Sequence, residues 1–277
     1  MKANLINIGV STLVLLNHPI TEATRALVNL GFRIIELFCD SPSFHPDRMR
    51  GDEIGQLLEL KKKSGLTYYL HAPIEGLNPA DSYPPIYEET LRLYRRSVEV
   101  SHQLLCSGVV LHPGHLPHPE ASREDAFRNS TQLIQSVLGT AEKNHVPLLI
   151  ENTGTKETTL FRQVPDFCSF VHFFSEELVN GLMDVGHAEL QGLDLIEMVN
   201  GLGKRLVHLH LHDNSGKKDG HLPLGRGVIK IKALLKALKS LQWKGTGIIE
   251  IYGCEQYERD LEECMEFLTG RSHGRKT

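Results

Sequence analysis

The chain has 277 residues, of which 40% are hydrophobic, and its formal net charge is −4. This length is that of one large α/β domain or two small ones, and the hydrophobic fraction is enough for a full core. The charge excludes an overall positive field that would attract nucleic acid, although a local basic patch stays open. Met1–Leu5 leads into a strand-like segment and no apolar stretch is long enough to span a membrane, so we expect a cytoplasmic protein.

Strand-like and helix-like segments alternate along the whole chain. The apolar runs that predict strands are Ile6–Thr12, Arg33–Cys39, Thr67–Pro73, Gly108–Gly114, Pro147–Thr153, Gly181–His187, Leu206–Asn214 and Thr246–Gly253. The helical patterns are Thr21–Leu30, Asp52–Ser64, Tyr87–Leu105, Arg123–Asn144, Pro165–Phe174, Leu193–Leu202, Ile231–Leu241 and Glu255–Leu268. Strands rich in Val, Ile and Leu with little alternation are typical of a parallel sheet that is buried on both sides.

Eight strands that alternate with eight helices predict a single (β/α)₈ barrel, the TIM barrel. We assign residues 1–270 to this barrel and 271–277 to a polar C-terminal tail. A doubly wound open sheet is the alternative, but it would not normally bring six strand ends to one point. The five cysteines are scattered without a CxxC pair, which predicts reduced thiols rather than a disulfide framework.

Six of the predicted strands end on, or just before, a residue that can bind a metal ion. These residues are His71, His112, Glu151, Asp184 with His187, His210 and Glu250, and the loop after the seventh strand adds Asp219 and His221. Functional residues of a barrel gather at the carboxyl ends of its strands, so we expect these side chains to converge. Imidazole and carboxylate without thiolate suit Zn²⁺ or Mn²⁺, and also Fe²⁺.

Glu151 and Glu250 each end a buried apolar strand, where an unpaired charge would cost several kcal/mol or be neutralised. The alternative to metal binding is a structural salt bridge with Arg33, Lys204 or Arg205. The two matching positions, with Asp184 and His210 between them in the sequence, favour metal binding by all four residues.

Asp184 and His187 are three residues apart, and Gly186 allows the chain to turn so that both face the barrel mouth. The alternative is a helix start capped by Asp184, with His187 on the surface. Asp219 and His221 could form a ligand pair on a loop that acts as a lid, and their alternative is a surface turn.

His208, His210 and His212 alternate along one strand, so their side chains point to the same face. We assign His210 as the ligand, His208 to the buried layer beneath it and His212 to the mouth. Three further polar residues near strand ends are candidates for substrate binding: His115, Asn152 and Arg226. Arg226 could hold a phosphate or carboxylate with two hydrogen bonds, and a surface salt bridge is its alternative.

At these positions the chain resembles the xylose isomerase-like TIM-barrel superfamily, which includes sugar isomerases, sugar epimerases and endonuclease IV. The resemblance covers nearly the whole chain. It depends on Glu36 in RIIEL, His71 in LHAP, His112 in LHPG, Glu151 in IEN, Asp184 and His187 in DVGH, His210 in HLHD, Asp219 and His221 in DGHLPLGRG, and Glu250 in IIEIY.

The resemblance implies two ligand patterns. The epimerase-like members hold one divalent metal by Glu, Asp, His and Glu, which implies the set Glu151, Asp184, His210 and Glu250. In that pattern Glu151 and Glu250 are catalytic and exchange a proton with the carbon next to a carbonyl. Endonuclease IV holds three zinc ions, which implies all nine residues: His71, His112, Glu151, Asp184, His187, His210, Asp219, His221 and Glu250.

Two departures from the family pattern bear on function. Family members usually carry Glu at the position of Arg226, and the lesion-clamping loops of endonuclease IV have no match here.

The expected function is therefore that of a metal-dependent isomerase or epimerase of a small sugar, sugar phosphate or sugar-derived acid, with one to three divalent ions. The alternatives are an endonuclease IV-like zinc phosphodiesterase and a non-catalytic metal-holding barrel. The expected partner is a small carbohydrate-like molecule; nucleic acid is disfavoured, and a homo-oligomer is compatible with the sequence.

Overall fold

The computed structural model of the protein describes residues 6–40, 44–155, 157–253 and 255–270. In this part of the chain, eight parallel strands close into a barrel in sequence order, with β8 paired to β1. They are β1 (Asn7–Ser11), β2 (Ile34–Phe38), β3 (Thr67–His71), β4 (Val109–Leu111), β5 (Leu148–Glu151), β6 (Val179–Asp184), β7 (Leu206–Leu211) and β8 (Thr246–Ile249). The predicted TIM barrel is confirmed, and the open-sheet alternative is wrong.

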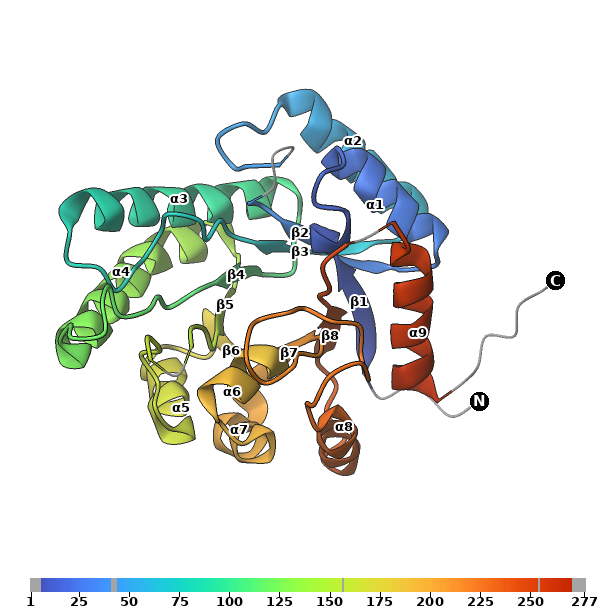
Figure 1. The fold of residues 1–277 in the computed structure, drawn as a ribbon. Helices are drawn as coiled ribbons and strands as arrows, with labels where there is room; N and C mark the ends of the chain where they lie inside the picture. Colours follow the sequence, from blue (N-terminus) through green and yellow to red (C-terminus); the bar gives the residue numbers. More distant parts are fainter. Residues whose placement is uncertain (1–5, 41–43, 156, 254, 271–277) are drawn as a thin grey trace.

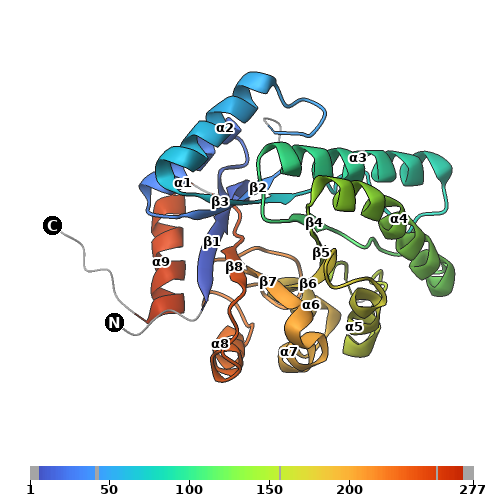
Figure 2. The same ribbon diagram turned by 180° about the vertical axis from the view of Figure 1, so that it is seen from behind.

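Helices surround the strands, as the two opposite views in Figure 1 and Figure 2 show. They are α1 (Ile20–Asn29), α2 (Gly51–Ser64), α3 (Pro84–Gln103), α4 (Arg123–Asn144), α5 (Val164–Phe173), α6 (Val185–Gln191), α7 (Leu195–Leu202), α8 (Ile231–Ser240) and α9 (Tyr257–Thr269). Two short 3₁₀ helices, η1 (Thr12–Leu15) and η2 (Gly203–Arg205), follow β1 and precede β7. The predicted tail 271–277 lies outside the described residues.

Helix α4 shows how the sequence specifies this outer layer. The Ser122 hydroxyl caps the first turn by accepting a hydrogen bond from the backbone N–H of Asp125. Leu133, Val137 and Ala141 follow at intervals of four residues and are fully buried. Residues at this spacing share one side of a helix, so this side packs against the barrel.

The segment after β6 differs from the sequence prediction, which has one strand-like run to His187. In the structure β6 ends at Asp184 and α6 begins at the next residue. The cause is local, because the Asp184 carboxylate accepts a hydrogen bond from the His187 backbone N–H at 2.6 Å and so caps the helix. Gly192 then ends α6 in a left-handed conformation, and the separate helix α7 starts beyond it.

A small apolar layer fills the barrel beneath its carboxyl end. Val110, Leu149 and Leu182 form this layer, and Tyr69 and Val207 pack against it. Side chains two residues apart on a strand point to the same side. Tyr69, Val110, Leu149 and Leu182 lie two positions before His71, His112, Glu151 and Asp184, respectively. The polar residues therefore form the next layer of the barrel interior, above an apolar floor.

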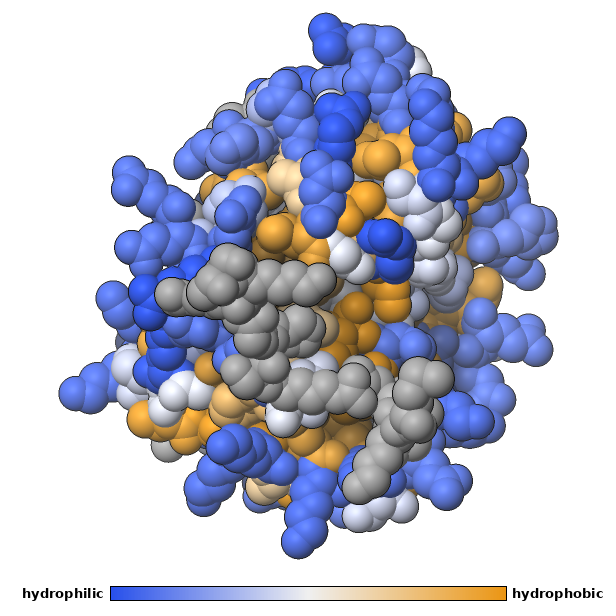
Figure 3. All heavy atoms as spheres, turned by 90° about the vertical axis from the view of Figure 1, so that its right-hand side faces the viewer, coloured by the Kyte–Doolittle hydropathy of each residue, from blue (hydrophilic) through white to orange (hydrophobic). Residues whose placement is uncertain are grey.

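The outer surface is polar, as expected for amphipathic helices packed on a barrel. Figure 3 shows the face that carries α1, α2 and α9, where hydrophilic side chains form most of the outline and hydrophobic atoms show between them. Within the described residues, no helix combines the length and the apolar character that a membrane span requires. Cys39, Cys106, Cys168 and Cys264 carry free thiols, and Cys254 lies outside the described residues.

Candidate metal centre

The nine residues predicted as metal ligands come together at the carboxyl end of the barrel. His71, Glu151 and Asp184 are the last residues of β3, β5 and β6; His210 lies on β7; His112 and Glu250 follow β4 and β8; His187 lies on α6; and Asp219 and His221 lie in the loop after β7. Closure of the barrel makes these strand ends neighbours, although the residues span 180 positions of the sequence, from 71 to 250. The centre is therefore a product of the fold and not of one local motif.

Glu151 lies at the middle of this group. Its Oε2 is 3.1 Å from His112 Nε2 and 3.4 Å from His71 Nε2, and its Oε1 is 3.0 Å from His187 Nδ1 and 3.5 Å from His210 Nδ1. The side chain is 1% exposed. Burial alone would raise the Glu151 pKa, but His112 and His210 outweigh it and hold the pKa well below its ordinary value. Glu151 is therefore a buried, ionised carboxylate that four imidazoles surround.

The salt-bridge alternative for Glu151 and Glu250 is wrong, because the three basic residues are engaged elsewhere. The Arg205 guanidinium donates to three backbone carbonyl groups, and that of Arg33 donates to two. Lys204 pairs with Glu176 at 2.6 Å. The countercharges of the two buried glutamates are therefore imidazoles.

His210 contacts the other three residues of the one-metal pattern. Its Nδ1 is 3.1 Å from Glu250 Oε2, 3.5 Å from Glu151 Oε1 and 3.7 Å from Asp184 Oδ2. Burial lowers the His210 pKa, but Glu250, Glu36 and Glu151 raise it by more, so the pKa lies well above the ordinary value. Three carboxylates from three strands thus face a single imidazole nitrogen.

A second group lies beside the first, on the loop after β7. Asp219 Oδ2 is 3.1 Å from both His187 Nε2 and His221 Nε2. The other ring nitrogen of His221, Nδ1, lies 2.8 Å from the backbone carbonyl oxygen of Glu250. These contacts hold Asp219 and His221 against the centre, so they do not form a free surface turn. Burial lowers the His221 pKa, but Asp219 and Glu250 raise it to about 9.

The residues present fit a divalent metal ion. Among the described residues, the sets whose ligand atoms approach one another within 4.8 Å include His71–His112–Glu151, His71–His210–Glu250 and His187–Asp219–His221. Glu151 Oε2 and His210 Nδ1 are buried and make no hydrogen bond, in spite of their polar neighbours. Imidazole and carboxylate donors suit Zn²⁺, Mn²⁺ and Fe²⁺, and a bound cation would satisfy both atoms.

Asn152, predicted to contact substrate, points to the backbone of Asp184 and does not line the cleft described below. Its side chain is fully buried, its Nδ2 donates to the Asp184 carbonyl oxygen at 3.1 Å, and its Oδ1 accepts from the Asp184 N–H at 2.8 Å. Asn214 is similarly occupied, because its Nδ2 donates to the Gly186 carbonyl oxygen. Both amides thus fix the backbone around Asp184.

Arg226 also differs from the substrate-binding prediction, and its surface salt-bridge alternative is what the structure contains. Its guanidinium donates to Asp260 and Glu263 on α9. The loop behind it is held by Asp213. The Asp213 carboxylate accepts hydrogen bonds from three backbone N–H groups of this region, those of residues 214, 225 and 229.

His212 and Glu36 are closer to the centre than the sequence suggested. His212 is fully buried, not at the mouth, and its Nε2 lies 3.0 Å from Asp184 Oδ2. Glu36, which is absent from the predicted ligand set, is fully buried on β2 and lies 2.9 Å from His210 Nε2 and 3.0 Å from His208 Nε2. The signal that could have identified Glu36 is a carboxylate inside the apolar run IIELF.

A cleft of about 440 Å³ opens beside the metal centre. The loops after β3, β4 and β5 line it, with His112 and His187 among its residues. His115, predicted to contact substrate, also lines it, and its backbone is fixed by hydrogen bonds to the Asn78 side chain. The described residues that line the cleft include no lysine or arginine.

Comparisons with known proteins connect this geometry to a family. The model of the family described as xylose isomerase-like TIM barrel matches residues 24–270. An uncharacterized protein of Methanocaldococcus jannaschii, MJ1311, is 25% identical over 94% of this chain and 88% of its own length. The probable endonuclease 4 of Mycobacterium leprae is 22% identical over 92% and 96%, and the fructoselysine 3-epimerase of Shigella flexneri is 21% identical over 84% and 85%.

Solved structures share the architecture. The crystal structure of a D-tagatose 3-epimerase-like protein superposes with a TM-score of 0.82, at 24% sequence identity, over 96% of this chain and 99% of that chain. At this level of identity the likeness establishes the fold, whereas the activity has to be argued from the site.

Proposed function

The chain belongs to the xylose isomerase-like TIM-barrel family, and we propose that it is a divalent-metal-dependent isomerase or epimerase of a small sugar or sugar-derived acid. The observation that carries this proposal is the pair Glu151 and Glu250. The two carboxylates come from different sides of the barrel mouth, and both face His210 Nδ1, at 3.5 Å and 3.1 Å. Proton transfer next to a carbonyl needs two such groups around one bound carbon.

The residues divide the chemistry between them. Glu151, Asp184, His210 and Glu250 would hold the ion, which when bound polarises the carbonyl and hydroxyl oxygens of the substrate. One glutamate removes the proton from the carbon next to the carbonyl. The other glutamate, carrying a proton, returns it to the opposite face of that carbon in an epimerisation, or the proton is delivered to the neighbouring carbon in an isomerisation. The pKa of both carboxyls lies below its ordinary value, so each can start as the base.

The cleft supports a small substrate without a phosphate group. Its volume of about 440 Å³ is in the usual range of small-molecule sites. Because Arg226 is engaged with α9 and the described lining residues include no lysine or arginine, we favour a substrate without phosphate. The epimerases among the sequence relatives and structural neighbours are consistent with this class.

Exchange of solvent deuterium tests the proposal directly. The protein is purified without chelators, loaded with Mn²⁺ or Zn²⁺, and incubated in D₂O with a panel of ketoses, ketose phosphates and sugar acids. We expect deuterium at the carbon next to the carbonyl of at least one unphosphorylated compound, together with its epimer or isomer. Absence of exchange across the whole panel with either metal would refute the proposal.

A second candidate is a zinc phosphodiesterase related to endonuclease IV. The specific observation in its favour is that His71, His112, Asp219 and His221, which the one-metal pattern does not require, also lie at the centre. Several ions in one site can bind both the attacking and the leaving oxygen of a phosphodiester. Cleavage of a duplex with an abasic site, with two or three zinc ions per chain, would make this the preferred function.

A further inference from the structure

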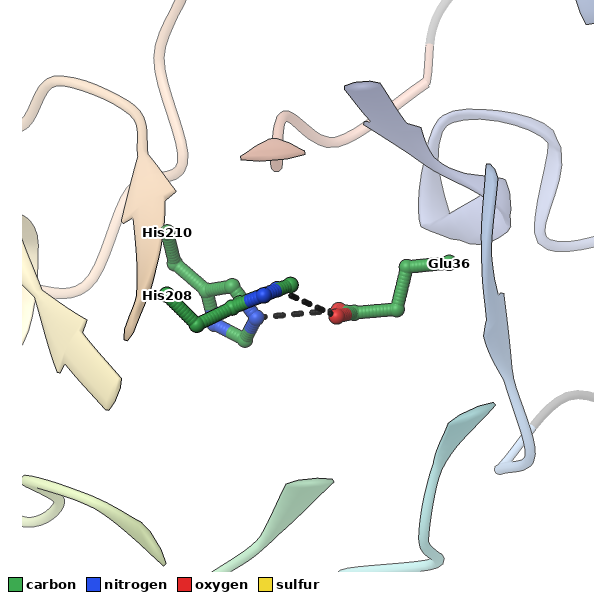
Figure 4. A group of neighbouring side chains, drawn as sticks. All are labelled: Glu36, His208 and His210. Carbon is green, nitrogen blue, oxygen red and sulfur yellow. Dashed lines mark hydrogen bonds and ion pairs between the residues drawn. The ribbon is translucent and has the colours of Figure 1, made fainter. Parts of the chain in front are cut away.

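A carboxylate with two imidazoles lies inside the barrel, directly below the candidate metal centre. Glu36 extends from β2 across the barrel toward β7, where His208 and His210 point toward it (Figure 4). Glu36 Oε1 is 2.9 Å from His210 Nε2, and Glu36 Oε2 is 3.0 Å from His208 Nε2. All three side chains are fully buried. Such a group is costly to bury unless its charges are paired.

The geometry determines which nitrogen of His210 is available to an ion. His210 Nε2 lies 2.9 Å from Glu36 Oε1 without the geometry of a hydrogen bond, but two lone pairs this close would repel, so this nitrogen carries a proton. In the metal-free protein the other nitrogen, Nδ1, also faces carboxylates and carries a proton, and it is the nitrogen that gives up its proton when an ion takes that place. This is the atom that faces Glu250, Glu151 and Asp184. The buried carboxylate thus selects the tautomer that the centre needs.

We propose that Glu36 is a positioning residue that fixes His210 with its proton on Nε2, so that Nδ1 is the ligand atom, and that His208 holds Glu36 in the required rotamer. This inference rests on one part of the proposed function, the binding of a metal ion at His210. Carboxylates that accept the second N–H of a ligating histidine orient the ring and raise its basicity, and their loss typically weakens metal binding about 10–100-fold.

The alternative, a metal ion held by Glu36, His208 and His210, fits these distances less well. Each carboxylate oxygen lies against one imidazole nitrogen, and the contact with His208, at 3.0 Å, is a hydrogen bond. The Tyr69 ring also packs edge-on against His208, with centroids 4.5 Å apart. Among the described residues three ligand atoms meet here, whereas a structural zinc site normally has four.

Glu36→Gln tests the proposal because it keeps the side-chain shape but changes one acceptor into an NH₂ donor. One of the two imidazoles then faces a donor and has to turn or change its tautomer. We expect the Zn²⁺ dissociation constant, measured by competition with a chromophoric chelator, to increase about 10–100-fold. In ¹⁵N-histidine NMR spectra of the zinc-loaded protein, the Nδ1 and Nε2 resonances of His210 should change. Asp260→Asn, a buried carboxylate-to-amide change on α9, is the matched control and should alter neither measurement.

Variants at His208 provide a second test in case Glu36→Gln does not fold. His208→Gln can still donate to Glu36 and should bind Zn²⁺ within about threefold of the wild type, whereas His208→Leu removes the donor and should bind more weakly. Three results would overturn the proposal: Glu36→Gln with unchanged Zn²⁺ affinity, weakened binding with unchanged His210 resonances, or loss of one ion per chain at unchanged affinity for the others. The zinc measurements need no substrate, so failure of the D₂O exchange in the wild-type protein would refute the proposed function alone.

Discussion

At the scale of the residue, the neighbours of a side chain decide its chemistry more than its type does. Glu151 and Asn152 are adjacent at the end of β5, and both were candidates for the site. Successive side chains of a strand point to opposite sides. Glu151 therefore enters the barrel, and Asn152 points away and fixes the Asp184 backbone. This outcome was predictable from the period of a strand.

The two glutamates give the first prediction. Glu151→Gln or Glu250→Gln removes a base but keeps the side-chain volume, so the barrel should fold while deuterium exchange falls at least about 100-fold. Exchange is measured in D₂O and folding by circular dichroism. His118→Gln, a change on the exposed loop after β4, is the control and should keep full exchange. Unchanged activity and metal content in both glutamate variants would contradict the prediction.

Arg226 gives the second prediction, because its ion pairs lie on the outside of the barrel. Arg226→Ala should lower the free energy of unfolding by less than about 1 kcal/mol, as expected for a partly exposed ion pair. It should not change KM for any substrate of the panel. A KM that rises for a phosphorylated compound alone would show that Arg226 contacts a phosphate, and the preference for a substrate without phosphate would have to be withdrawn.

At the scale of the element, the alternation of strands and helices was readable because the apolar runs are clearly separated. The boundary between β6 and α6 was not, because Asp184 has two roles. Its carboxylate caps α6 through the His187 N–H and also faces His210 and His212. A sequence pattern treats the cap and the ligand as alternatives, whereas the structure uses one side chain for both.

Gly186, on the first turn of α6, gives the third prediction. A Cβ atom at this position would lie 2.0 Å from His212 Cε1, so the imidazole would have to move away from Asp184. We expect Gly186→Ala to cost about 1–3 kcal/mol in urea unfolding and to weaken Zn²⁺ binding. The control is Gly139→Ala in α4, where a Cβ meets nothing within 4 Å and about 0.5–1 kcal/mol of stabilisation is expected. Equal effects of the two substitutions would show that His212 does not hold Asp184.

At the scale of the whole molecule, barrel closure is what turns nine scattered residues into one centre. The sequence predicts this because six apolar runs end in metal-binding residues and parallel strands present their ends on one side. The same logic missed Glu36, which lies within its run and not at its end, so only the position of β7 across the barrel reveals its partners. Interactions across a barrel connect distant strands and leave no local pattern.

The concentration of imidazoles predicts how the metal-free protein responds to pH. His71, His187, His210 and His221 all have a raised pKa in the folded state. The folded protein therefore binds these protons more tightly than the unfolded chain. The resulting stability is fully present below pH 6.5, the ordinary value, and is lost as the pH rises through the folded-state pKa, which is about 9 for His221.

The last prediction follows from this sign. Chelator-treated protein should become less stable in urea as the pH is raised from 6.5 to 9, with a contribution from His221 on the order of 3 kcal/mol. A divalent ion should remove this loss, because it takes the place of the protons between the imidazoles and the carboxylates and binds more strongly as the imidazoles deprotonate. Unfolding curves at several pH values, with and without Zn²⁺, measure both effects. Stability of the metal-free protein that stays constant or rises over this interval would mean that the imidazoles do not neutralise the buried carboxylates.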